Sequence, residues 1–117
     1  MSEDPAAPRE YATAERCYIT EYVNRPSFPG VSVAQARVLP GVTTALHTVT
    51  VEEWYVIRSG GGLMHLGGRE PFPVAPGDSV RIPPGCEQKI TNTGTTDLLF
   101  LCVCAPRFTP SCYRSLE

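Results

Sequence analysis

The stretch GVTTALHTVTVEEWYVIRSG, residues 41–60, decides the fold of this chain. Glycine stands at both ends, and between them lie Glu53 and His47, one of only two histidines in the sequence. The segments TALHTVTV and EWYVIRS are rich in β-branched and aromatic residues, which favour strands. The stretch therefore predicts two successive strands, with His47 on the first and Glu53 on the second.

A second stretch, GDSVRIPPGCEQKITN at residues 77–92, has similar punctuation. Gly77 permits a turn with positive φ, and Pro83 and Gly85 set a tight corner between two short strands. Gln88 lies near the start of the second of these strands. This stretch therefore predicts another pair of strands separated by a turn.

The rest of the chain has the same alternation of short strands and turns. Further strands are predicted at CYITEYV, VSVAQARVL, LMHL and LLFLCVC, which turn residues separate. No segment has a sustained 3.6-residue periodicity with helix caps. Strands that recur about every 8–12 residues are typical of an all-β sandwich or barrel, and 117 residues fit one domain.

The composition narrows the classes of function. The net charge is −2 and the basic residues are scattered, so neither a nucleic-acid surface nor a polybasic membrane-binding run is predicted. No apolar run approaches the ~20 residues of a membrane span, and the acidic, Pro-rich start MSEDPAAPRE differs from a signal peptide. We therefore expect a cytoplasmic protein whose five cysteines are free thiols.

Two motifs give the chain a resemblance to the cupins, a family of small jelly-roll barrels. The first stretch keeps every spacing of the motif G-x5-H-x-H-x3,4-E-x6-G, with Val49 in place of the second His. The second stretch keeps every spacing of G-x5-P-x-G-x2-H-x3-N, with Gln88 in place of the His. Two separated blocks at fixed spacing are far more specific than one short motif.

The resemblance implies an all-β fold, the cupin double-stranded β-helix or jelly-roll barrel, in a single domain. We expect a flexible N-terminal arm over residues 1–16, the barrel over residues 17–106, and a C-terminal tail over residues 107–117 that packs on the barrel. Because small cupins often dimerise, a homodimer is also expected, with residues 17–23 added to the partner's sheet. The other expected partner is a small-molecule ligand, with no nucleic acid and no membrane.

The motif positions converge on one point inside such a barrel. Residues of equal parity on a strand share a face, so His47 and Val49 point the same way, and Tyr55 shares the face of Glu53. In the cupins that this chain resembles, three His and one Glu hold a divalent metal at this point. Here the resemblance leaves His47, Glu53 and Gln88 as metal ligands, and the expected cofactor is a divalent ion, Mn, Fe, Zn or Ni.

A metal-free, hydrogen-bonded cluster of the same side chains is the alternative. Gln is a weaker metal donor than imidazole, and a buried Glu53 needs a partner that His47 can supply. With or without a metal, Glu53 and His47 are the predicted catalytic residues, and without one they form an acid–base pair. Tyr55, Gln88 and Cys102 are predicted to contact a ligand in the barrel.

Four other positions leave alternatives open. His65 is either a rim residue or the source of the missing imidazole. Cys102 and Cys104 share one face of their strand, which we expect to point inward because small side chains leave room for a ligand. Arg107 either binds an anionic group of the substrate or belongs to a solvated C-terminal arm.

Three functions are compatible with these residues. The first is a divalent-metal enzyme of dioxygenase, isomerase or lyase type that acts on a small organic substrate. The second is a metal-free module that binds a sugar or metabolite without catalysis. The third is a pure interaction or storage role for a homodimer. Metal content after purification would separate the first function from the others.

Overall fold

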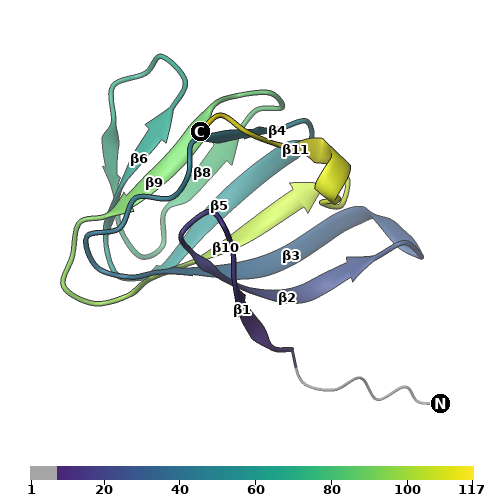
Figure 1. The fold of residues 1–117 in the computed structure, drawn as a ribbon, viewed down its shortest axis with the longest axis horizontal. Coiled ribbons are helices and arrows are strands. Elements are labelled where there is room, and N and C mark those ends of the chain that lie inside the picture. Colours follow the sequence, from purple (N-terminus) through teal and green to yellow (C-terminus); the bar gives the residue numbers. More distant parts are fainter. Residues whose placement is uncertain (1–7) are drawn as a thin grey trace.

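The structure is a computed structural model that describes residues 8–117. In it, two antiparallel β-sheets face each other (Figure 1). The strands in chain order are β1 (Glu10–Ala12), β2 (Tyr18–Arg25), β3 (Phe28–Val38), β4 (His47–Val49), β5 (Glu52–Ser59), β6 (Gly62–Leu66), β7 (Phe72–Val74), β8 (Ser79–Ile82), β9 (Gln88–Asn92), β10 (Leu98–Ala105) and β11 (Tyr113–Ser115). A short 3₁₀ helix, η1 (Pro110–Cys112), precedes β11. No helix in this part of the chain is long and apolar enough to cross a membrane.

The chain crosses repeatedly from one sheet to the other. The six-stranded sheet has the order β1-β2-β3-β10-β5-β8, and the five-stranded sheet has the order β11-β4-β9-β6-β7. Strands β3, β5, β8 and β10 belong to the first sheet, and the strands between them belong to the second. This alternation winds the chain into a double-stranded β-helix, which confirms the predicted fold class.

Two strand pairings set the positions of the motif residues His47, Gln88 and Glu53. His47 of β4 lies opposite Gln88 of β9, and Glu53 of β5 lies opposite Cys104 of β10. Gly60, which ends the first motif, has a φ of +81°, and a Cβ there would meet the Asp97 carbonyl oxygen at 2.6 Å. Only glycine fits this turn, because both its conformation and its close backbone contact exclude a side chain.

Both chain ends form strands that the sequence did not predict. Residues 1–7 of the predicted arm lie outside the described residues, but Glu10–Ala12 form β1 along β2. The Arg37 guanidinium anchors β1, with its Nη2 at 2.7 Å from Glu10 Oε1 and its Nη1 at 3.1 Å from Asp97 Oδ2. In the predicted tail, β11 extends the five-stranded sheet by pairing with β4.

The core fills one half of the space between the sheets. Alternate residues of β5, β6, β9 and β10 point inward, as their alternating burial shows. The largest apolar side chains that are less than 2 % exposed are Phe100, Ile57, Met64, Ile82, Ile90, Leu98 and Val38. The opposite parity points outward, and Trp54 is 37 % exposed on the outer face of the six-stranded sheet.

Candidate functional site

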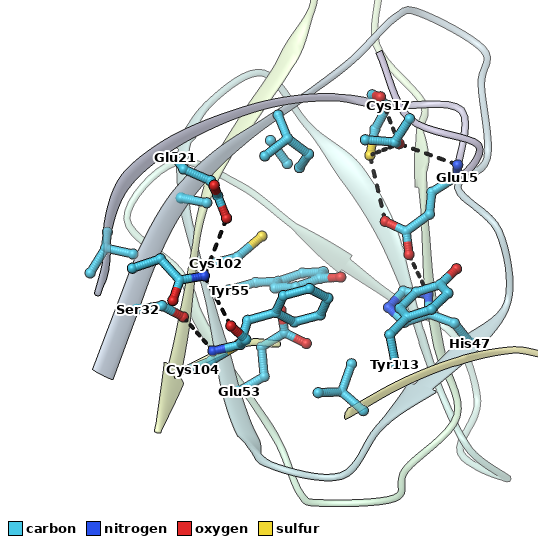
Figure 2. Close-up of a pocket in the computed structure, with 18 of the residues that line it drawn as sticks. Glu15, Cys17, Glu21, Ser32, His47, Glu53, Tyr55, Cys102, Cys104 and Tyr113 are labelled. Atoms are coloured by element: carbon cyan, nitrogen blue, oxygen red, sulfur yellow. Dashed lines mark hydrogen bonds and ion pairs between the residues drawn. The ribbon is translucent and has the colours of Figure 1, made fainter. Parts of the chain in front are cut away.

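The other half of the space between the sheets is a cavity of about 360 Å³. Its wall comes from both sheets, from the segment between β1 and β2, and from the C-terminal tail (Figure 2). The polar and titratable residues that line it include Glu15, Cys17, Glu21, Asn24, Ser32, His47, Glu53, Tyr55, Cys102, Cys104 and Tyr113. Most of the remaining wall is apolar, which is typical of small-molecule sites with a few placed polar groups.

Glu53 is the most perturbed carboxyl group of this wall. The residue is 6 % exposed, and its Oε1 has no hydrogen-bond partner among the described residues. Burial raises the pKa of the Glu53 carboxyl to about 7, and the nearby charge of Glu15 acts in the same direction. The Gln88 amide and the Cys104 thiol oppose this shift without satisfying Oε1. Glu53 therefore takes up or releases a proton near neutral pH.

Gln88 does not line the cavity itself but holds Tyr55, a residue that does. It is fully buried and is not among the side chains that line the cavity, whereas Tyr55 is. The Tyr55 hydroxyl donates a hydrogen bond of 2.8 Å to Gln88 Oε1. Burial raises the pKa of Tyr55 well above its usual value, so the phenol keeps this proton. Gln88 Nε2 has no hydrogen-bond partner among the described residues.

His47 presents one ring nitrogen for proton transfer. Its Nδ1 lies 2.8 Å from the Ala45 carbonyl oxygen, and since a carbonyl oxygen only accepts, Nδ1 carries the hydrogen. In the neutral ring Nε2 is then the acceptor. The ring stacks on Tyr113, with 5.1 Å between the centroids, and the residue is 4 % exposed. His47 is therefore held in one orientation beside the cavity and can accept a proton at Nε2.

Glu15 is a cavity residue that the sequence analysis did not identify. Its Oε2 lies 3.6 Å from His47 Nδ1, and Figure 2 shows its carboxylate beside the His47 and Tyr113 rings. The Glu15 carbonyl accepts a 3.1 Å hydrogen bond from the Ala45 amide, which joins the segment before β2 to the segment before β4. In the sequence Glu15 is a single acidic residue in a polar stretch, so no motif or periodicity marks it.

The cavity thiols are poor nucleophiles. Cys17, Cys102 and Cys104 all line the cavity, so the structure places the Cys face of β10 inward, as expected. Burial raises the pKa of Cys17 to about 11 and the pKa values of Cys102 and Cys104 well above their usual value. Because only the thiolate is a strong nucleophile, these side chains act as small wall groups at neutral pH.

Two other candidates lie away from the cavity wall. His65 of β6 lies opposite Lys89 of β9 and is not among the lining residues. Arg107 is also absent from the lining residues, and its Nη1 donates a 2.8 Å hydrogen bond to Asn24 Oδ1. Neither side chain therefore supplies a cavity group in this arrangement.

The predicted metal ligands, as they are arranged, do not fit a resident divalent metal. Residues 8–117 contain no group of three or more His, Cys, Asp or Glu side chains placed to hold an ion. The Gln88 oxygen already accepts the Tyr55 hydroxyl, and Val49 has no donor atom. His47 and Glu53 remain, whereas catalytic metal sites commonly use three protein ligands. A metal bound by His47, Glu53 and Gln88 stays a prediction from the resemblance.

Comparison with known proteins identifies relatives of the chain. The model of the cupin domain family matches residues 34–104. An uncharacterised protein from Methanocaldococcus jannaschii is 38 % identical over 112 residues, which cover 93 % of this chain and 89 % of the relative.

Solved structures share the fold at low sequence identity. A double-stranded β-helix protein from Klebsiella pneumoniae, itself uncharacterised, has a TM-score of 0.76 and 18 % identity, with 92 % of this chain and 90 % of that chain covered. Oxalate decarboxylase from Bacillus subtilis has a TM-score of 0.82 and 20 % identity, and covers 93 % of this chain but 30 % of its own. The nucleoside dehydratase Pac13 of Streptomyces has a TM-score of 0.78 and 18 % identity, with 95 % and 86 % covered. At these identities the likeness shows the fold alone.

Proposed function

The chain belongs to the cupin family, and from this premise we propose that it binds a small organic molecule in its barrel and acts on it by metal-independent acid–base chemistry. The observation that supports this proposal is the Glu53 carboxyl. It lines the cavity, it has an unpaired buried oxygen, and its pKa is raised to about 7. A general base or acid works best when its pKa lies near the working pH.

The neighbouring groups complement Glu53. In its ionised form the Glu53 carboxylate removes a proton from the substrate, and in its protonated form it returns one. His47 accepts or donates a proton at Nε2, and the Glu15 carboxylate lies 3.6 Å from its Nδ1. Two such groups on one cavity suit proton shifts next to a carbonyl and eliminations, which are isomerase-type and lyase-type reactions. Two neighbours with the same fold, a decarboxylase and a dehydratase, are enzymes, and this supports an enzymatic role by analogy of fold.

The location and the oligomeric state belong to the same proposal. Five free cysteines favour the reducing cytoplasm. In this chain β2 pairs with its own β3, and β1 covers part of the outer edge of β2. The expected homodimer, with residues 17–23 added to the partner's sheet, would use the part of the β2 edge that β1 leaves open.

Proton exchange without a metal tests the proposal. EDTA-treated protein is incubated in D₂O with a panel of small hydroxy-, keto- and amino-carbonyl compounds, and deuterium incorporation is followed by NMR. We expect the wild type to exchange a carbon-bound proton of at least one compound, and Glu53→Gln to lose roughly 10² to 10⁴-fold of this rate. Glu52→Gln is the matched control, because Glu52 pairs with Arg81 outside the cavity.

The other outcomes separate the alternatives. Exchange that requires added Mn, Fe, Zn or Ni would overturn the metal-independent proposal in favour of a metal enzyme. Binding of a panel compound without exchange would identify a binding module. If Glu53→Gln retains the full rate, Glu53 is not the catalytic group.

A further inference from the structure

We propose that the ligand of this cavity is a cation, a small organic ammonium compound with an apolar body. This inference rests on the proposed function, since it names the class of molecule that the barrel binds. Its basis is the charge of the cavity wall, the unpaired oxygen of Glu53 and the aromatic rings beside it.

The charged groups of the wall are nearly all acidic. Three carboxyl groups line the cavity, those of Glu15, Glu21 and Glu53, and no Arg or Lys is among the lining residues. His47 is the one basic side chain among them, and Glu15 already lies 3.6 Å from it. Several carboxylates around a cavity with apolar walls create a negative potential that attracts cations and repels anions.

Arg107 is not among the lining residues and makes its polar contacts to Asn24 and to the backbone. Arg107 donates from Nη1 to Asn24 Oδ1 at 2.8 Å, and its backbone amide donates to the Pro29 carbonyl at 3.0 Å. The Asn24 amide in turn donates to Glu21 Oε2 at 3.2 Å, at the exposed rim of the cavity. A carboxylate or phosphate in the cavity would therefore meet three acidic groups without a guanidinium or ammonium to pair with it.

The Glu53 carboxyl is satisfied only in part by the protein, because the Gln88 amide and the Cys104 thiol act on it without forming a hydrogen bond to Oε1. It is 6 % exposed, it lines the cavity, and its Oε1 has no partner among residues 8–117. A buried carboxylate that the protein satisfies only in part is stabilised by a hydrogen-bond donor or a positive charge on a ligand beside it. An ammonium group supplies both the N–H donor and the opposite charge.

Aromatic rings accept the rest of such a ligand. Tyr113 stacks on His47 and meets the Phe108 ring edge-on at 6.4 Å, while Tyr55 and Phe100 pack with their centroids 4.4 Å apart. All five rings line the cavity. Aromatic faces attract cations and cover apolar groups, so this wall complements an ammonium compound with an apolar body. The volume of about 360 Å³ is that of a small-molecule pocket.

Two shape-matched series of probes test the charge preference. Benzylamine, benzyl alcohol and benzoate form one series, and cyclohexylamine, cyclohexanol and cyclohexanecarboxylate form the other. Binding is measured by calorimetry at pH 8. In at least one series we expect the amine to bind 10-fold or more tightly than the alcohol, and the carboxylate to bind more weakly than both.

Variants assign the preference to the cavity carboxyl groups. Glu53→Gln and Glu15→Gln should each lower the amine-to-alcohol ratio to about 3 or less, and circular dichroism of each variant checks that the fold stays intact. Glu52→Gln, outside the cavity, should leave the ratio unchanged. The inference is overturned if no amine binds more tightly than its alcohol, if a carboxylate binds as tightly as its amine, or if the ratio survives in the Glu15→Gln, Glu53→Gln double variant.

The two proposals fail in different ways. Proton exchange on neutral carbonyl compounds, together with no preference for amines, would overturn the cationic ligand and leave the acid–base proposal standing. A clear preference for amines without any proton exchange would support the cationic ligand and overturn the acid–base proposal.

Discussion

The two halves of the barrel interior are filled in opposite ways, although the same strands build both. Along β10, Leu98 packs in the filled half and is 0 % exposed, Phe100 stands at the boundary and lines the cavity, and Cys102 and Cys104 enter the half that is hollow. Ala34, opposite Cys102 on β3, also lines the hollow half. The change from large to small side chains along one strand thus creates the cavity.

The packed half mainly contributes stability, and the hollow half carries the chemically active groups. The packed half is apolar and its side chains are close-packed, so it supplies most of the free energy of folding that burial provides. In the hollow half lies the buried, unpaired oxygen of Glu53, an arrangement that costs stability and that functional sites tolerate. Variants in the two halves should therefore respond differently.

The largest effect is expected in the packed half. Ile90 is 0 % exposed between the sheets, and Ile90→Ala should lower the free energy of unfolding by about 2 to 5 kcal/mol, because it removes buried methyl groups and leaves a cavity. Urea denaturation followed by circular dichroism measures this loss. A loss below about 1 kcal/mol would contradict the close packing of this half.

The next effect is a pH dependence that arises from Glu53 in the hollow half. Its pKa is about 7 in the folded chain and near 4.5 in the unfolded chain, so the folded state holds the proton more tightly. Stability from this group is therefore present at low pH and is lost as the pH rises through the interval from 4.5 to 7. Between pH 5 and pH 8 the loss should amount to between about 2 and 3 kcal/mol.

Paired denaturation series at pH 5 and pH 8 measure this dependence. Glu53→Gln, which cannot ionise, should remove it, whereas Glu52→Gln should keep it. If the wild type and Glu53→Gln change in parallel with pH, another group causes the effect.

A buried amide in the packed half gives a somewhat smaller effect. The Asn92 amide donates to the carbonyl oxygens of Val38 and Thr96 at 2.9 and 2.8 Å, and its Oδ1 accepts from the Gly94 amide at 2.9 Å. Asn92→Ala leaves these buried groups unpaired and should cost about 2 kcal/mol. The matched variant at the cavity rim, Asn24→Ala, should cost less than about 1 kcal/mol because water reaches that position. Thermal unfolding of both variants provides the comparison, and equal losses would contradict it.

The smallest effect on stability is expected from the cavity wall itself. Cys102 lines the cavity, so Cys102→Ala removes few contacts and should change the free energy of unfolding by less than about 1 kcal/mol. The same variant enlarges the cavity. Urea denaturation of Cys102→Ala and Ile90→Ala, measured side by side, compares the two halves. If both variants lose the same free energy of unfolding, the two halves do not differ in packing.

The sequence predicted the barrel because local signals and the motifs agree. Gly41, Gly60, Gly77 and Gly85 all have positive φ, as turns between the predicted strands require. The strands β1, β7 and β11 were missed because three-residue strands are too short to show a period. Their pairing depends on neighbours from other parts of the chain, such as Arg37 for β1.

The candidate site was predictable only in part. Parity placed His47, Glu53 and Tyr55 on inward faces, and all three line one cavity. The role of Gln88 toward Tyr55 depends on how a buried amide turns, which spacing does not specify. Glu15 was missed because contacts between distant segments fix it, among them the ion pair of its neighbour Arg16 with Glu117 at 3.0 Å.

The ends of the chain give the cavity much of its chemical identity. Glu15, Glu21 and Tyr113 all lie outside residues 34–104, the part that the cupin domain family shares. Changes at the cavity-lining positions of these two terminal segments can therefore alter ligand preference. For protein engineering, Glu15, Glu21 and Tyr113 are the positions to vary, with Cys17 and Ile19 kept because they pack on the core.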